Sequence, residues 1–178
     1  MEAVQEFREI FEKVKAGIRL SQDDGNRLIH SKNIVELGAM ADFGRKRLHQ
    51  DKAHFTHSIN VNHSNICVLE CKFCAFAKKK KDPGAYSLSN DEIERRVVVA
   101  AKHGVWEVHI VGGLDPELKL SYYEEMLRRI KTSCPGVLIQ AFTAVELDFY
   151  ARLEKITVEE VIDRLIAAGL GGVPGGGA

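Results

Sequence analysis

The sequence predicts an α/β protein, part of a parallel (βα) barrel preceded by N-terminal helices. Three strand-like runs recur, "HSINVN" at 57–62, "WEVHIV" at 106–111 and "VLIQAF" at 137–142, and "GGV" at 171–173 starts a fourth. Helix-start signals follow these runs at nearly equal intervals. A crossover helix returns the chain to the same end of the sheet, so the strands are expected to be parallel. A closed barrel has eight such strands, so the count predicts a partial one.

The first fifty residues have a different pattern of apolar residues and are predicted to be helical throughout. Gly17 helps to end a first helix, a second follows Ser21, and a third covers about 33–49. We therefore expect two regions, a helical one at 1–50 and the partial barrel at 51–178. The first helix carries an apolar stripe at three- and four-residue steps, formed by Val4, Phe7, Phe11, Val14 and Ile18.

Helix starts in the second region are predicted from capping boxes, in which a hydroxyl and a glutamate satisfy the free amide donors of the first turn. The helices that follow have apolar faces, and two of them are expected to end at Gly104 and Gly169, the other before Pro135. Three sequences match the box: Ser89-x-x-Glu92, Ser121-x-x-Glu124 and Thr157-x-x-Glu160.

Composition excludes several classes of function. Lys and Arg total 25, as do Asp and Glu, so no net charge draws the whole molecule to nucleic acid or to an anionic membrane. The longest purely apolar run, "VVVAA" at 97–101, is too short for a signal sequence or a membrane span. The sequence therefore predicts a cytoplasmic protein that binds neither nucleic acid nor membranes.

The stretch "NICVLECKFCAF" at 65–76 holds Cys67, Cys71 and Cys74, three of the four cysteines. It follows the first predicted strand, at the end of a parallel sheet where ligand sites collect. Clusters of this kind in a reducing compartment more often bind metal than form disulfides, and a Cys67–Cys71 disulfide is a minor alternative. Cys134 is expected to be an ordinary half-buried thiol.

Two kinds of metal centre are compatible with this spacing. A zinc site needs a fourth ligand, which His57 or His63 would have to supply. An iron–sulfur cluster held by three cysteines instead leaves one iron open to a small molecule.

The residues resemble a known family at this point. Cys67-x-x-x-Cys71-x-Phe73-Cys74 resembles the CxxxCxφC signature of radical S-adenosylmethionine (SAM) enzymes. Within that superfamily, "NVNHSNICVLECKFCAFAK", "HIVGGLDP", "AFTAVEL" and "PGGGA" resemble the aminofutalosine synthase family of menaquinone biosynthesis. The resemblance covers nearly the whole chain and implies a partial radical-SAM barrel. Asp115 stands where that family usually has His.

The resemblance implies the chemistry. Cys67, Cys71 and Cys74 would hold a 4Fe–4S cluster, and S-adenosyl-L-methionine would be consumed as a co-substrate. The family reaction adds the 5′-deoxyadenosyl radical to 3-[(1-carboxyvinyl)oxy]benzoate and gives 6-amino-6-deoxyfutalosine. Such a transferase takes a small-molecule substrate and an acidic electron donor such as flavodoxin or ferredoxin.

The resemblance also implies roles for residues around the cofactor. Phe73 would lie beside the adenine, and Gly112 and Gly113 would let backbone groups approach the amino group of the cofactor. Phe73 also fits a plug that keeps water off the cluster, and a Gly-Gly pair alone is more often a simple turn. Asn62, at the end of the first strand, is a further cofactor-binding candidate or a residue that shapes the turn.

Two polar residues are candidates for catalysis. Glu146 follows the third strand, where it would reach the ribose or the substrate, or else serve as a solvent-facing carboxylate at a helix start. His109 lies within the second strand, facing the barrel lumen or packing as a satisfied side chain. The run Lys78–Lys81 is either a solvated loop surface or a docking site for the acidic electron donor.

Other functions remain open from the sequence. The cyclic dehypoxanthinyl futalosine synthases and the deazaflavin-forming enzymes share the cysteine motif, and a zinc-stabilised binding module without catalysis is the alternative of another class. The last predicted strand would have an unpaired edge. We therefore expect an incomplete enzyme that self-associates or depends on a second polypeptide to complete the barrel.

Overall fold

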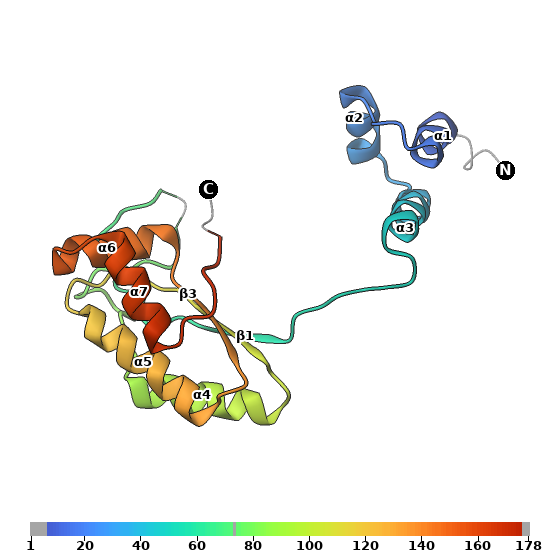
Figure 1. The fold of residues 1–178 in the computed structure, drawn as a ribbon. Coiled ribbons are helices and arrows are strands. Elements are labelled where there is room, and N and C mark those ends of the chain that lie inside the picture. The colour runs from blue at the N-terminus through green and yellow to red at the C-terminus, as the bar shows by residue number, and fades with distance from the viewer. Residues whose placement is uncertain (1–6, 73, 176–178) are drawn as a thin grey trace. The chain divides into compact units, whose positions relative to one another are not determined.

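The computed structural model describes residues 7–72 and 74–175, and the chain divides into two compact units, Met1–Phe55 and Thr56–Ala178. Figure 1 shows helices alone in the first unit, and a sheet with helices in the second.

The first unit consists of α1 (Arg8–Ala16), α2 (Gln22–His30) and α3 (Ile34–His49), so the three predicted helices are confirmed. Gly17 ends α1 in the left-handed conformation, with φ 72°, and Ser21 caps α2. Because α1 ends there, Ile18 leaves the predicted stripe and is 58% exposed, while Val4 lies outside the described residues. The core of the unit is formed by Phe7, Ile10 and Met40.

The second unit contains a sheet of three parallel strands in the order β1-β2-β3, which confirms the predicted parallel arrangement. The strands are β1 (Ser58–Val61), β2 (Glu107–Ile110) and β3 (Leu138–Ala141). The register pairs Ile59 with Val108 and Val108 with Ile139, so the apolar side chains of the three strands share one face.

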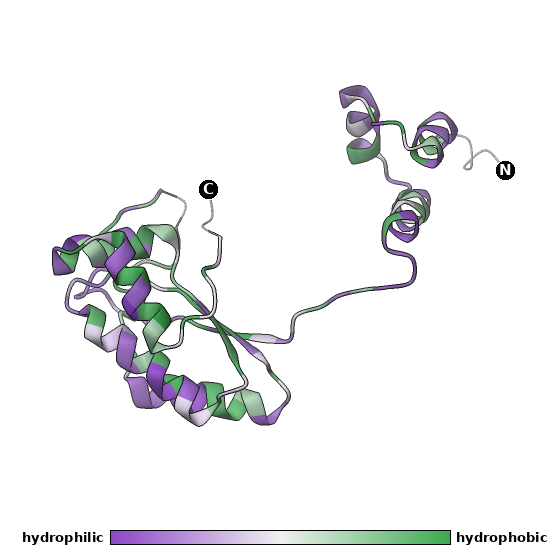
Figure 2. Ribbon diagram, in the orientation of Figure 1, coloured by the Kyte–Doolittle hydropathy of each residue, from purple (hydrophilic) through white to green (hydrophobic). Residues whose placement is uncertain are grey.

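Helices pack against that apolar face. They are α4 (Asn90–Lys102), α5 (Leu120–Ser133), α6 (Ala144–Glu154) and α7 (Val158–Ala168). Their buried residues join those of the strands in one core, and Figure 2 shows green apolar stripes alternating with purple polar ones along these helices. The largest fully buried side chains of this core include Tyr123, Tyr150, Phe142, Ile93 and Ile110.

The predicted helix starts are confirmed at two of the three capping boxes. Thr157 and Glu160 form the complete reciprocal box of α7, and Ser89 accepts from the backbone N–H of Glu92 at the start of α4. The capping box predicted at Ser121 is wrong, because α5 already begins at Leu120 and Lys119 is its N-cap. Both carboxylate oxygens of Glu124 instead accept hydrogen bonds from the guanidinium of Arg164 of α7, at 2.8 and 3.1 Å.

A helix whose bounds were not predicted from the sequence follows β3. Thr143 and Glu146 form a complete capping box that starts α6. The chain then forms α7 and returns to the sheet, where Gly172 pairs with Gln140 in a parallel bridge beside β3. This bridge confirms the predicted start of a fourth strand.

The turn from β3 into α6 has an unusual backbone. Phe142 has φ 66°, in the left-handed region that residues with side chains seldom adopt, and its ring is fully buried. Its N–H donates to the Ile110 carbonyl at 2.9 Å, which ties the end of β3 to that of β2.

Among the described residues, no helix is both long enough and apolar enough to cross a membrane.

Candidate functional site

The candidate site lies where β1, β2 and β3 end. The three segments that leave the carboxyl ends of these parallel strands carry the cysteines, the Gly-Gly pair and Glu146 respectively. Carboxyl ends of neighbouring parallel strands lie at one edge of the sheet, which is where α/β proteins bind ligands.

The backbone around the cysteine loop is held by a small ladder of hydrogen bonds. The Asn65 side chain accepts from the Tyr86 N–H at 2.7 Å and donates to the Gly84 carbonyl at 2.9 Å. The Cys67 N–H donates to the Lys78 carbonyl at 3.0 Å. The loop that carries the thiols is therefore closed at its base by its own residues.

The three thiols line one cavity. Cys67 is half-buried, Cys71 and Cys74 are exposed, and a cavity of about 150 Å³ is bounded by all three together with Glu70 and other loop residues. The Cys74 N–H donates to the Cys71 carbonyl at 3.0 Å, which fixes a turn between two of them. Phe73 lies outside the described residues.

The histidines considered for a zinc site are not at this loop. His57 precedes β1, and its ring lies near Gly104, whereas His63 is fully buried beneath Gly112. Within the described residues, no group of three or more His, Cys, Asp and Glu side chains is placed to hold one metal ion. A cluster differs from one ion because each thiolate binds a separate iron, so three cysteines around one cavity fit a cluster better.

Gly112 and Gly113 are required by close packing of the chain against itself. A Cβ on Gly113 would lie 2.1 Å from the Ile66 carbonyl oxygen, and one on Gly112 would lie 2.5 Å from the His63 ring. The Gly113 N–H also donates to the Ser64 carbonyl at 2.7 Å. The glycines thus bring the loop after β2 against the base of the cysteine loop.

Glu146 connects two of these loops. One carboxylate oxygen accepts from the Gly112 N–H at 3.0 Å, and the other accepts from the N–H and hydroxyl of Thr143 at 2.7 and 2.8 Å. Burial raises the pKa of Glu146, and its hydrogen bonds with Thr143 and Gly112 oppose that shift. Its expected position at a helix start is confirmed, but the solvent-facing alternative is wrong because only 3% of the residue is exposed.

Several buried aromatic side chains pack around Tyr123, next to the bases of the three loops. The Tyr123 ring lies 5.1 Å from His63, 5.3 Å from Phe142 and 4.3 Å from Tyr150 between ring centroids. Burial lowers the pKa of His63 to about 4, and burial raises the pKa of Tyr123. His63 is therefore a neutral packing residue at neutral pH.

His109 lies on β2, on the face of the sheet opposite the apolar one. Its Nε2 lies 2.7 Å from the Glu107 carboxylate, and its side chain is 35% exposed. Glu107 was not among the site residues predicted from the sequence, although residues two apart in a strand lie on the same face. Asn62, half-buried at the end of β1, accepts from the Tyr86 hydroxyl through its carbonyl at 3.4 Å.

Asp115 shapes the turn after the Gly-Gly pair. Its carboxylate accepts from the Ser87 hydroxyl at 2.8 Å and from the Glu117 N–H at 3.0 Å, and the residue is 3% exposed. It borders a cavity of about 270 Å³ that Cys67 also lines.

The lysine run lies beside these cavities. Lys79 pairs with Glu70 at 3.0 Å, and Lys80 pairs with Glu117. In the described part of the chain, Lys78 and Lys81 make no ion pair. Two glutamates therefore offset half of the positive charge of the run.

A parallel βα sheet with three thiols around one cavity, apposed to a glycine loop, defines an iron–sulfur enzyme of the α/β barrel class. Residues 61–176 match the Radical SAM superfamily, and the chain belongs to that superfamily. Its members use a 4Fe–4S cluster and S-adenosylmethionine, and the donor set of three cysteines fits that cluster.

Relatives from several groups of enzymes are similar to nearly the whole chain. The aminodeoxyfutalosine synthase of Thermus thermophilus is 37% identical over 169 residues, 95% of this chain and 45% of that protein. The cyclic dehypoxanthine futalosine synthase of Streptomyces coelicolor is 34% identical over 177 residues, 97% of this chain and 44% of that protein. The chain thus spans less than half the length of these relatives.

Solved structures show the same fold. The FeFe-hydrogenase maturase HydG from Carboxydothermus hydrogenoformans superposes with a TM-score of 0.60 at 18% identity, covering 98% of this chain and 48% of that one. Methylornithine synthase (PylB) gives a TM-score of 0.59 at 16% identity, covering 93% of this chain and 57% of that one. The predicted partial radical-SAM barrel is confirmed.

Proposed function

We propose that this chain forms part of an aminofutalosine synthase, a transferase of menaquinone biosynthesis. The observation that carries the proposal is the 37% identity with the aminodeoxyfutalosine synthase of Thermus thermophilus over 95% of the chain. "AFTAVEL" lies within this similarity and forms the end of β3 and the start of α6, where Glu146 joins the loops.

Residues of the chain have distinct tasks in this proposal. Cys67, Cys71 and Cys74 hold the cluster, which when bound supplies the electron that cleaves S-adenosylmethionine into methionine and the 5′-deoxyadenosyl radical. Gly112 and Gly113 hold the loop after β2 close to the cysteine loop, so that backbone groups there face the cofactor. Phe73 and Asn62 are proposed to contact the cofactor.

The proposed substrate is 3-[(1-carboxyvinyl)oxy]benzoate, whose enolpyruvyl double bond takes the adenosyl group before loss of the carboxylate. Glu146 is committed to Gly112 and Thr143 by three hydrogen bonds, so its role is to hold the loop rather than to move a proton. His109 is the proposed residue that touches the substrate. An acidic flavodoxin or ferredoxin is the proposed electron donor.

The test is an anaerobic reaction of the reconstituted chain with reductant, S-adenosylmethionine and the enolpyruvyl benzoate, followed by mass spectrometry. Because the chain spans 45% of the length of the Thermus thermophilus relative, we expect little or no adenosylated product from it alone and clear product from a chain of the relative's full length. The Cys71→Ala variant is the control and should form none. Product from Cys71→Ala, or none from a chain of the relative's full length, would contradict the proposal.

A second candidate is a cyclic dehypoxanthine futalosine synthase, because the relative from Streptomyces coelicolor is similar over 97% of the chain. The two activities separate by substrate. Incubation with dehypoxanthine futalosine instead of the enolpyruvyl benzoate should give no cyclic product if the chain is an aminofutalosine synthase.

A further inference from the structure

The face of the sheet away from the helices is polar. Parallel sheets that are covered on both sides carry nearly continuous apolar strands, whereas these strands alternate. A face of this composition is suited to a polar ligand rather than to a packed core. Its residues in the three strands are Ser58, Asn60, Glu107, His109, Leu138 and Gln140.

Glu107 is the charged residue of this face, and both of its oxygens have partners. One lies 2.7 Å from His109 Nε2, and the other accepts from the Gln140 amide at 3.4 Å. Glu107 is only 5% exposed, and a buried carboxylate needs such partners. Because a carboxylate only accepts hydrogen bonds, Nε2 of His109 carries the proton of this contact.

The other ring nitrogen of His109 can form a hydrogen bond with a ligand. Nδ1 of His109 has no hydrogen bond within the described residues, and neither does the side-chain amide of Asn60. The register places Asn60 directly beside His109, on strands that lie about 4.8 Å apart. A protonated Nδ1 and the Asn60 amide are thus two neighbouring donors, the arrangement that a carboxylate accepts well.

We propose that Asn60 and His109 bind a carboxylate of the substrate, and that Glu107 and Gln140 are positioning residues for His109. The ligand class is an aryl or enol-ether carboxylate, which rests on the proposed function. His109 precedes Gly112 by three residues, about 10 Å along a strand. A substrate bound at His109 can therefore extend toward the loops that carry the cysteines.

The first test is nitrogen-15 NMR of the histidine rings in the full chain, with the His109 signals assigned from a His109→Gln variant. We expect Nε2 of His109 to carry a proton in the free chain, because it faces the Glu107 carboxylate. Addition of 3-[(1-carboxyvinyl)oxy]benzoate should shift the Nδ1 signal of His109, whereas its dimethyl ester should not. Absence of a proton on Nε2 in the free chain, no response to the dianion, or an equal response to the ester would overturn the inference.

Variants separate the two roles. Asn60→Asp should weaken binding of the dianion at least tenfold, while the matched change Asn26→Asp on α2 should leave it unchanged. Glu107→Gln should give mixed ring tautomers of His109. Wild-type affinity in Asn60→Asp, or equal weakening in Asn26→Asp, would count against the site. Binding of the dianion, together with no adenosylated product from a chain of the relatives' full length, contradicts only the proposed function. Product without any response of His109 contradicts only this inference.

Discussion

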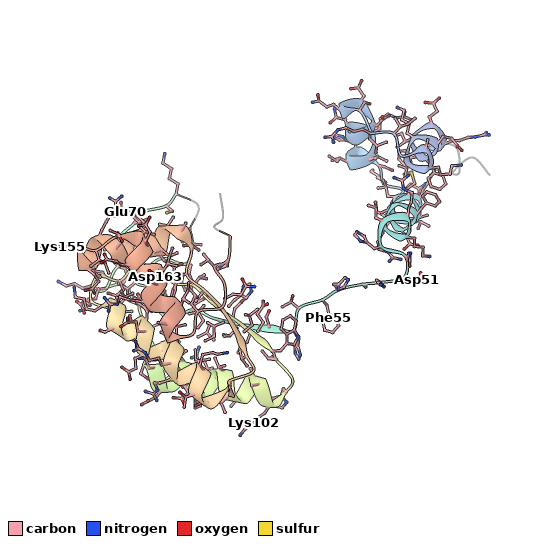
Figure 3. The ribbon with its side chains drawn as sticks, in the orientation of Figure 1. Asp51, Phe55, Glu70, Lys102, Lys155 and Asp163 are labelled. Carbon is pink, nitrogen blue, oxygen red and sulfur yellow. The ribbon has the colours of Figure 1, made fainter. Side chains whose placement is uncertain are left out.

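The Glu146 carboxylate accepts a hydrogen bond from the backbone N–H of Gly112 at 3.0 Å, across 34 residues of sequence. This contact joins the start of α6 to the glycine loop, next to the cysteines. Figure 3 shows the side chains of the two units as sticks and labels Glu70, which lies on the cysteine loop.

Glu146→Gln should therefore destabilise the second unit. The amide nitrogen of glutamine cannot accept, so a buried donor loses its partner, at a cost of about 2 kcal/mol in the free energy of unfolding. Trp106, the one tryptophan of the chain, reports this unit by fluorescence during denaturant unfolding. Glu160→Gln is the matched control, because it changes the exposed capping box of α7 and should cost less. Equal losses in the two variants would contradict a special role for the Gly112 contact.

Replacing the four cysteines one at a time by alanine should not affect cluster assembly equally. Cys67→Ala, Cys71→Ala and Cys74→Ala should each abolish assembly, because each removes one thiolate ligand. Cys134→Ala should leave the iron content unchanged, since Cys134 is buried at the end of α5 and burial raises its pKa. The measurement is iron and sulfide content after anaerobic reconstitution, with wild-type iron in Cys71→Ala as the contradicting result.

Gly113→Ala should disturb the site through the backbone. The added methyl group would meet the Ile66 carbonyl oxygen at 2.1 Å, so the loop must shift, at a cost of about 1–3 kcal/mol. Less iron should be retained after gel filtration of the reconstituted protein. Gly136→Ala is the control, because nothing lies within 4 Å of its added carbon. Unchanged iron in Gly113→Ala would show that the loop adapts.

His63 should make the stability of the second unit depend on pH. Its pKa is lowered to about 4 by burial, below the usual 6.5, so the unfolded chain binds a proton first as the pH falls. Stability is then lost between pH 6.5 and pH 4, by about 3 kcal/mol at 1.36 kcal/mol per pKa unit, and the effect levels off below pH 4. His63→Gln should remove this part of the pH dependence, measured by Trp106 fluorescence in denaturant. The same slope in both proteins would exclude His63 as its source.

The lysine run should affect reduction by a protein donor. Changing Lys78–Lys81 to Gln should slow reduction by flavodoxin at low salt and flatten its salt dependence, since screening acts over about 10 Å at 0.1 M. The ion pairs with Glu70 and Glu117 reduce the net charge, so Lys78 and Lys81 should account for most of the effect. Reduction by dithionite is the control. Equal slowing with both reductants would place the lysines in folding or the active site instead.

Much of the fold could be predicted from the sequence, because apolar alternation and caps are local signals. The three strands and the parallel topology depend on such signals. Ser121 shows the limit, since its box pattern is present but Glu124 pairs with Arg164 from a helix forty residues away. Thr143 shows the converse, since it forms a complete box with Glu146 that was not among the three predicted, although Glu146 was considered at a helix start.

The site was less predictable, because its contacts join distant segments. The cysteines were visible as a motif, and Glu146 was visible as a carboxylate after a strand. Its contact with Gly112, and the packing of Gly113 on Ile66, depend on how three loops meet at the sheet edge. Glu107 was missed because a strand glutamate is only informative once its partners His109 and Gln140 are known.

The left-handed backbone conformation at Phe142 limits which residues can replace it. The left-handed conformation costs about 1–2 kcal/mol for a residue with a side chain, and glycine would avoid that cost. Glycine would also remove a fully buried ring that packs on Tyr123 and Tyr150, a loss of about 3–5 kcal/mol. A β-branched residue would worsen the backbone and leave the space unfilled. Natural variation here should therefore be confined to large flat side chains, and a change of ring should arise together with changes at Tyr123 or Tyr150.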